Sequence, residues 1–274
     1  MNIMINMKKP QNQSNNLNVL ETLGFALLKI PKGENSIKNF KLIYQKGIGL
    51  SMLQNIGELC KDEITKKNKG NSIIPIEDYT FTIHYFKDYN DNTMLAIYMD
   101  HRESQLNYAQ VYLLTKKINS FISEGKEKPE IKQFCNDRIN IPKTTNLEAL
   151  FVISQAGQPY FVMVGNKNTN MEKSQVNISG FISALFSFSA EIIGDNSGAK
   201  LKVIDFGKQR FYIITKKQAI FAFLVKDMND LLKRYMYLIS DEFIHRYKED
   251  LRSFDGDVSK YEGFKQVIRK YFKI

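Results

Sequence analysis

The sequence has few of the residues from which disulfide frameworks and metal sites are built. Its 274 residues include only two cysteines and three histidines. Cys60 and Cys135 lie far apart, inside segments with helical periodicity. A disulfide framework is therefore excluded, and a reducing compartment, the cytoplasm, is expected. His84, His101 and His245 have no metal-ligand spacing. We therefore expect no metal and no cofactor.

Long apolar runs are also missing. The most apolar segment, residues 178–193, is interrupted by Glu191 and by several serines. It is shorter than the roughly 18–20 apolar residues that a membrane-spanning helix needs. Residues 1–18 are rich in Asn, Gln, Ser and Lys and contain no apolar stretch that could serve as a secretory signal. We interpret them as a flexible tail.

The short motifs of common catalytic sites are absent as well. The sequence contains no HExxH, no CxxC and no nucleophile elbow. Gly47 and Gly49 flank the start of a predicted helix, but the third glycine and the parallel crossover of a dinucleotide-binding loop are lacking. We predict no catalytic residue and a protein that is not an enzyme. An enzyme whose ionisable groups are brought together from distant segments stays open as an alternative.

The charge is strongly unbalanced, with 39 Lys and Arg against 29 Asp and Glu, a net charge of +10. Such an excess attracts acidic partners: an anionic membrane surface, a nucleic acid or an acidic protein. The sharpest local excess falls in residues 200–217. Its candidate contacts to an anionic membrane surface are Lys200, Lys202, Lys208 and Arg210. The alternative is an ordinary solvated strand face.

The two halves of the chain repeat one order of strand-like and helical segments. In the first half, runs rich in β-branched and aromatic residues predict strands at 23–30, 40–46, 73–76, 79–86 and 94–99. Three- and four-residue apolar spacing predicts a helix that begins after Gly47 and further helices at 106–122 and 131–138. In the second half, strands are expected at 147–154, 159–164, 200–206, 210–215 and 219–225, and helices at 174–193, from 227 onward and near the C-terminus.

This order predicts an α+β protein of two domains. Each domain is a five-stranded, mostly antiparallel sheet with one helix inserted after the second strand and one or two helices after the fifth, because strands joined by short turns are antiparallel. We place the domains at residues 19–140 and 147–274. Residues 141–146 form a linker that we expect to be open to proteases.

The order resembles that of longin and roadblock domains. The strongest match is residues 150–161 (LFVISQAGQPYF), which resemble the opening hairpin of these domains: an apolar strand, a glycine-containing turn and an aromatic second strand. Two such units in one chain resemble the tandem-longin subunits of regulators of small GTPases. The resemblance implies a scaffold or regulatory subunit in a membrane-trafficking-like system. Its expected partner is a small GTPase or another longin-type protein, with a homo- or heterodimer left open.

The predicted helix at 174–193 has apolar residues on more than one side, and Glu191 is its only charge. We expect the side with Phe181, Ile182 and Phe188 to cover the sheet, and the opposite side to face a partner. The candidate protein interface on that opposite side consists of Ser179, Ser183, Phe186, Ala190 and Ile193. Cover of this side by another part of the same chain is the alternative.

A nucleic-acid-binding protein is the second functional hypothesis. It depends on the net charge and on the 14 tyrosines and 19 phenylalanines, whose rings can stack on bases. Most of these rings fall at core-facing positions of the predicted elements, and no RNP-like or Gly-rich basic motif occurs. We therefore prefer the protein-binding hypothesis.

Overall fold

The computed structural model describes residues 18–33, 39–102, 107–165, 171, 173–193, 201–207 and 209–274. The side chains of residues 63–66, 190, 192 and 193 are outside this description. So are residues 1–17 of the predicted tail, together with Lys200 and Lys208 of the predicted basic contact.

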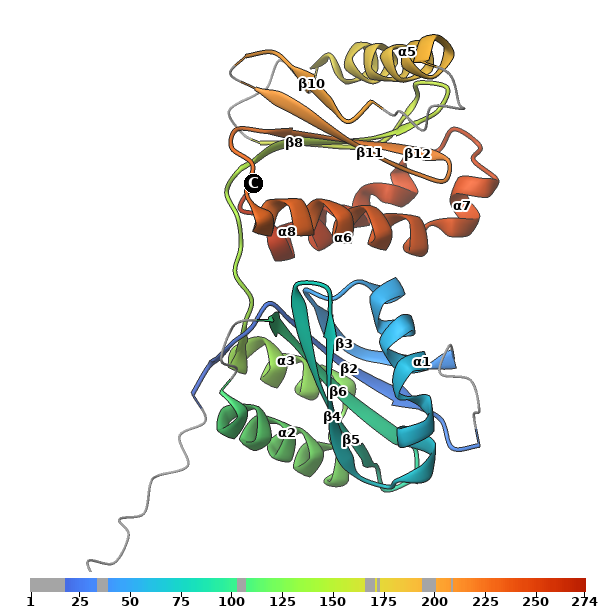
Figure 1. Ribbon diagram of the computed structural model, residues 1–274. Coiled ribbons are helices and arrows are strands. Elements are labelled where there is room, and N and C mark those ends of the chain that lie inside the picture. The colour runs from blue at the N-terminus through green and yellow to red at the C-terminus, as the bar shows by residue number, and fades with distance from the viewer. Residues whose placement is uncertain are drawn as a thin grey trace, which may run out of the picture.

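The first half of the chain forms a five-stranded sheet in the order β3-β2-β6-β5-β4, and all neighbouring strands are antiparallel (Figure 1). The strands are β2 (Gly24–Ile30), β3 (Lys41–Lys46), β4 (Gly70–Ile76), β5 (Tyr79–Lys87) and β6 (Thr93–His101). Helix α1 (Leu50–Lys66) covers one face. Helices α2 (Tyr108–Ser123) and α3 (Lys128–Arg138) cover the other. The sheet therefore has a core on each side.

The second half forms an equivalent sheet in the order β10-β11-β12-β8-β9, also antiparallel throughout. Its strands are β8 (Leu147–Ser154), β9 (Pro159–Val164), β10 (Val203–Asp205), β11 (Arg210–Lys216) and β12 (Ala219–Val225). Helix α5 (Gln175–Ile193) covers one face. The other is covered by α6 (Asp230–Arg246), α7 (Lys248–Arg252), η3 (Ser259–Phe264) and α8 (Lys265–Tyr271).

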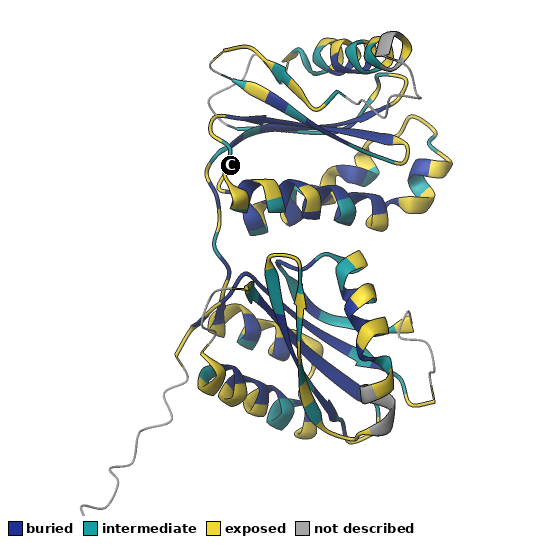
Figure 2. Ribbon diagram, in the orientation of Figure 1, coloured by how far each residue is buried: buried dark blue, intermediate teal, exposed yellow. Residues whose placement is uncertain are grey.

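The predicted fold class is confirmed: two five-stranded antiparallel sheets, each with a helix after its second strand and helices after its fifth, consistent with two longin-like domains. The central strands are buried on both faces, which explains why β12 is apolar along its whole length (Figure 2). Aromatic rings fill the space between the second sheet and its C-terminal helices. The ring of Phe243 contacts those of Phe161, Phe221, Tyr247, Tyr261 and Phe264.

The two sheets are joined through α6 and α8, which lie between them (Figure 1). Arg234 of α6 donates from Nη2 to the carbonyl of Leu23, 2.8 Å away. The hydroxyl of Tyr271 accepts from the backbone N–H of Gly47 at 3.2 Å. A parallel pair that the sequence did not predict, β1 (Leu20–Glu21) with β7 (Ile139–Asn140), ties the two ends of the first unit together.

The connecting segment, residues 141–146, packs against both units: Ile141 belongs to a core of the first, and the residues after it contact the second. Thr144 is buried, donates from its N–H to the carbonyl of Tyr271, and accepts on its own carbonyl from the N–H of Lys273. Tyr235 donates its hydroxyl to the carbonyl of Pro142. The boundaries of the two domains stay a prediction. The contacts of residues 142–144 lead us to expect that this segment resists proteases, whereas the sequence alone predicted an open linker.

We expect trypsin to leave the bond after Lys143 uncut in the folded protein. Cleavage requires local opening, and opening here breaks the backbone bonds of Thr144 and the bond from Lys143 Nζ to the Arg269 carbonyl. Digestion across a urea series, followed by mass spectrometry, should show this cleavage only where the chain unfolds. Two resistant fragments of similar size without denaturant would instead support an open linker.

Candidate protein interface

Helix α5 is rotated about its axis from the predicted orientation: Ile182 faces the sheet as predicted, but Phe181 and Phe188 do not. Ser179 and Ile182 are fully buried, and Ser183 is buried as well. Phe186 is half-buried and packs against the core that includes Ile182. The predicted interface residues Ser179, Ser183 and Phe186 therefore face the sheet, and this part of the prediction is wrong. The side chains of Ala190 and Ile193 lie outside the described residues.

The close approach of α5 to the β8–β9 turn explains this orientation. Gly157 in that turn has φ of +87°, and a Cβ added to it would lie 3.3 Å from Gly180 Cα and 3.4 Å from Ser183 Cβ. Ser183 Oγ donates to the carbonyl of Gln155 at 2.7 Å. Only small side chains fit so near the turn. This explains why a serine, and not a larger apolar residue, faces the turn at position 183.

The outer side of α5 exposes apolar side chains along the length of the helix. Val176 is 64% exposed, Phe181 49% and Phe188 60%. The small residues between them on this side are also exposed: Gly180, Ala184 and Ser187. Among the described side chains of α5, Glu191 is the only charge. Exposed apolar residues on one face of a helix are typical of interaction sites. We call this surface the outer α5 face; it consists of Val176, Gly180, Phe181, Ala184, Ser187 and Phe188.

Phe206 adds apolar surface on the same side of the second sheet. It follows β10, and its ring lies 6.1 Å from that of Phe211, centroid to centroid. Phe211 belongs to the core beneath α5, whereas Phe206 is 57% exposed. The apolar surface therefore extends beyond the helix itself.

The predicted basic contact is only partly described. Lys202 and Arg210 are exposed. Arg210 Nε lies 2.8 Å from Asp205 Oδ2, so its charge is locally balanced. The pKa of Asp205 is lowered, first by the backbone N–H of Gly207 and then by Arg210. A membrane contact through these residues stays a prediction.

The histidine nearest to a core is His84 in β5. Its imidazole is half-buried and meets the ring of Tyr98 edge-on at 6.1 Å, and burial lowers its pKa. It is therefore neutral at pH 7 and packs as part of the sheet.

Within the residues that the structure describes, no three His, Cys, Asp or Glu side chains are grouped to hold a metal ion. In the same residues, no helix has the length and apolarity to cross a membrane.

Comparison with known proteins gives a partial likeness. No protein-family model matches the chain, and the search of curated proteins found no match. Among solved structures, the chain is similar to a Roadblock/LC7 domain from Streptomyces avermitilis, at 15% sequence identity and a TM-score of 0.29. The match covers 37% of this chain and 85% of that one. The likeness is thus to one roadblock domain over part of the chain, and it assigns no family.

Proposed function

We propose that this chain is a protein-binding scaffold or regulatory subunit that docks a longin-type domain, in the first instance a second copy of itself, on the outer α5 face. The observation that carries the proposal is the exposure of Phe181 and Phe188 on a helix with one described charge. Aromatic side chains, phenylalanine among them, are enriched at the centres of protein interfaces.

The charge of the chain favours this face for self-association. At a net charge of +10, two copies repel each other, and that repulsion is smallest where the touching surfaces carry no cations. A two-fold interface places the same patch on both partners, and an uncharged apolar patch is complementary to itself. Phe181 and Phe188 are 49% and 60% exposed, so burial of what remains exposed contributes about half of the 1.5–3 kcal/mol for a whole side chain, roughly 1–1.5 kcal/mol each.

A helix of 19 residues is about 28 Å long, so its outer face together with Phe206 can form the centre of an interface. A stable interface buries at least about 1,000 Å² in total. The surfaces beside α5 must supply the rest, as polar rims do in other interfaces.

A small GTPase is the proposed regulatory partner, in a membrane-trafficking-like system. This finer assignment is supported by the resemblance of the two units to tandem-longin subunits of GTPase regulators. It is tested by capture of purified small GTPases, loaded with GDP or a GTP analogue, on the immobilised chain. Absence of binding to either nucleotide state would remove the GTPase from the proposal and leave the scaffold.

The docking surface is tested by light scattering on the purified chain and on Phe188→Glu. We expect the parent chain to dimerise and Phe188→Glu to be a folded monomer, because the partner would have to bury the new carboxylate. The matched control is Tyr112→Glu on α2, where an aromatic side chain that is 56% exposed lies far from α5. The control should dimerise normally. Equal association of Phe188→Glu and the control would exclude the outer α5 face.

A further inference from the structure

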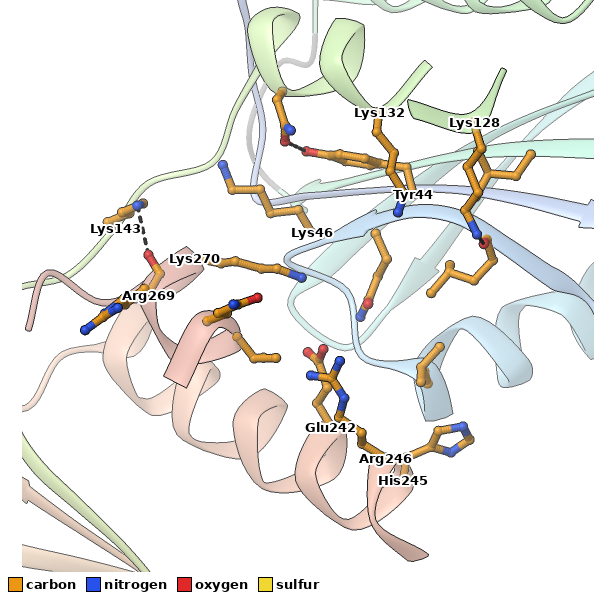
Figure 3. A pocket seen from close by; sticks show the side chains of 17 residues that line it. Tyr44, Lys46, Lys128, Lys132, Lys143, Glu242, His245, Arg246, Arg269 and Lys270 are labelled. Carbon is orange, nitrogen blue, oxygen red and sulfur yellow. Dashed lines mark hydrogen bonds between the residues drawn. The ribbon is translucent and has the colours of Figure 1, made fainter. Parts of the chain in front are cut away.

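A cavity of about 680 Å³ lies between the two halves of the molecule (Figure 3). One wall is formed by residues of β3, α1 and α3, and the other by residues of α6 and α8, with Lys143 of the connecting segment at one end. The lining also includes the apolar residues Leu42, Leu50 and Val267. Neither half of the chain forms this cavity alone, and we call it the basic groove.

The groove is lined by seven cationic side chains. They are Lys46, Lys128, Lys132, Lys143, Arg246, Arg269 and Lys270. Glu242 is the only acidic residue in the described lining. Within the described part of the chain, none of the seven forms an ion pair with a carboxylate. Lys128 and Lys143 donate instead to the backbone carbonyls of Leu42 and Arg269, which carry no charge.

The cations of the groove repel one another. The side chain of Lys46 is half-buried, and its pKa is lowered first by burial and then by the positive charges of Lys143 and Lys270. Glu242 does not neutralise the cluster fully. It is buried, one of its carboxylate oxygens has no hydrogen-bond partner in the described residues, and burial raises its pKa against the effect of Lys270 and Arg246. An anion between the walls would relieve this repulsion.

We infer that the basic groove binds a compact ligand that carries two or more phosphate groups. Its volume lies within the roughly 300–1,000 Å³ of small-molecule sites. Charge density decides between anions: a phosphate monoester carries about −1.5 to −2 near pH 7. An extended acidic peptide carries at most one charge per residue, about every 3.3 Å of chain. Seven cations around one small cavity therefore match clustered phosphates better than a peptide strand.

Two sources supply this chemistry, a soluble polyphosphorylated molecule and the phosphorylated headgroup of a lipid. Lysine binds phosphate as a point charge and suits both. The apolar lining residues Leu42, Leu50 and Val267 suit contact with the ring or sugar that carries the phosphates, in either source. This site is distinct from the outer α5 face, which lies on the opposite side of the second sheet (Figure 1).

The soluble probe is inorganic tripolyphosphate, titrated by calorimetry at about 150 mM salt, where long-range attraction is screened. The test variant is Lys46→Gln with Lys270→Gln. The control is Lys116→Gln with Lys226→Gln, which makes the same change in net charge at two exposed lysines outside the groove. We expect the test variant to bind at least about tenfold more weakly, with the control unchanged. The melting temperature of the unliganded test variant should stay equal or rise, because like charges are removed.

The second arm measures binding of the chain to lipid vesicles. Vesicles with about 5% phosphatidylinositol bisphosphate are compared with vesicles of equal charge that contain phosphatidylserine instead. Binding of tripolyphosphate supports a soluble ligand. Selective binding of the bisphosphate vesicles, lost in the test variant, supports a lipid headgroup. If the test variant melts more than about 5 °C lower, Lys132→Gln with Arg269→Gln replaces it, since both of these residues are exposed.

Three results would overturn the inference. One is that neither tripolyphosphate nor bisphosphate vesicles bind to the parent chain. Another is that the test and control variants lose equal affinity, which would mean a general effect of net charge. The third is that an oligonucleotide competes with tripolyphosphate for the groove and binds more than about a hundredfold more tightly per phosphate. That result would assign the groove to a nucleic acid.

Discussion

Ile182→Glu is expected to unfold the second half of the chain, whereas Phe181→Glu, one residue earlier, should leave it folded. Ile182 is fully buried against the sheet, and a carboxylate there has no partner and no water. An unpaired buried charge costs several kcal/mol, against a total stability of about 5–15 kcal/mol for a domain. Phe181 is 49% exposed, so its replacement puts the charge in solvent.

Urea unfolding followed by circular dichroism measures both variants. We expect Phe186→Glu to lie between them, because Phe186 is half-buried and its carboxylate can reach the edge of the helix. Phe188→Glu, at 60% exposure, serves as a second control that should remain folded, as Phe181→Glu does. If Phe181→Glu and Phe188→Glu unfold together with Ile182→Glu, the orientation that the apolar pattern first indicated is restored, because that pattern placed all three side chains against the sheet.

Gly47→Ala should cost at least about 3 kcal/mol of unfolding free energy. Gly47 has φ of +81°, a conformation that costs an L-residue about 1–2 kcal/mol. A Cβ there would lie 2.2 Å from the carbonyl oxygen of Leu23 and 2.8 Å from Gly24 Cα, so the backbone has to move. The move also disturbs the contact between the halves, since Leu23 accepts from Arg234 and Gly47 donates to Tyr271.

The matched control is Gly49→Ala, two residues later. A Cβ at Gly49 would meet no atom within 4 Å, and Gly49 begins helix α1 by accepting from the N–H of Leu53. Its replacement should change stability by no more than about 1 kcal/mol, the range for residues at a helix start. Chemical denaturation compares the two variants. Equal effects at Gly47 and Gly49 would mean that the tight turn is not required.

The strands and most helices follow from the sequence because their patterns are local. Alternation or continuous apolarity identified every strand of the two sheets, and three- and four-residue spacing identified α1 and α6. Strand β4 begins at Gly70, three residues before the predicted range 73–76, and it lies at the edge of the sheet, where Pro75 is tolerated. The parallel pair β1–β7 was missed because two residues carry no period and their partners lie more than a hundred positions apart.

The orientation of α5 could not be obtained from apolarity alone, because both sides of this helix are apolar. The deciding contact is steric: Gly157 in the β8–β9 turn admits only small residues of the helix, and this turn lies outside the helix sequence. Pairing the glycine of the QAGQ turn with Gly180 and Ser183, spaced three apart, is the signal that would have indicated it.

The basic groove was missed for a different reason. Its cations come from β3, α3, the connecting segment, α6 and α8, and they converge only when the two halves pack together. Along the sequence, basic residues are most concentrated at residues 200–217, but there the charge of Arg210 is balanced by an ion pair with Asp205. Local charge density along a chain is thus a poor guide to charge density in space.

Disulfide cross-linking at Ala184 tests the proposed scaffold most directly. Ala184 is exposed near the middle of α5, so two-fold packing through this helix brings its copies together. Both native cysteines are buried, and burial raises the pKa of Cys135 to about 12, so an introduced thiol is the reactive one. We predict that Ala184→Cys, at about 100 µM and under mild oxidation, gives a covalent dimer that Phe188→Glu abolishes. A parent chain that is monomeric by light scattering at that concentration, with no cross-link at Ala184→Cys, would contradict the account.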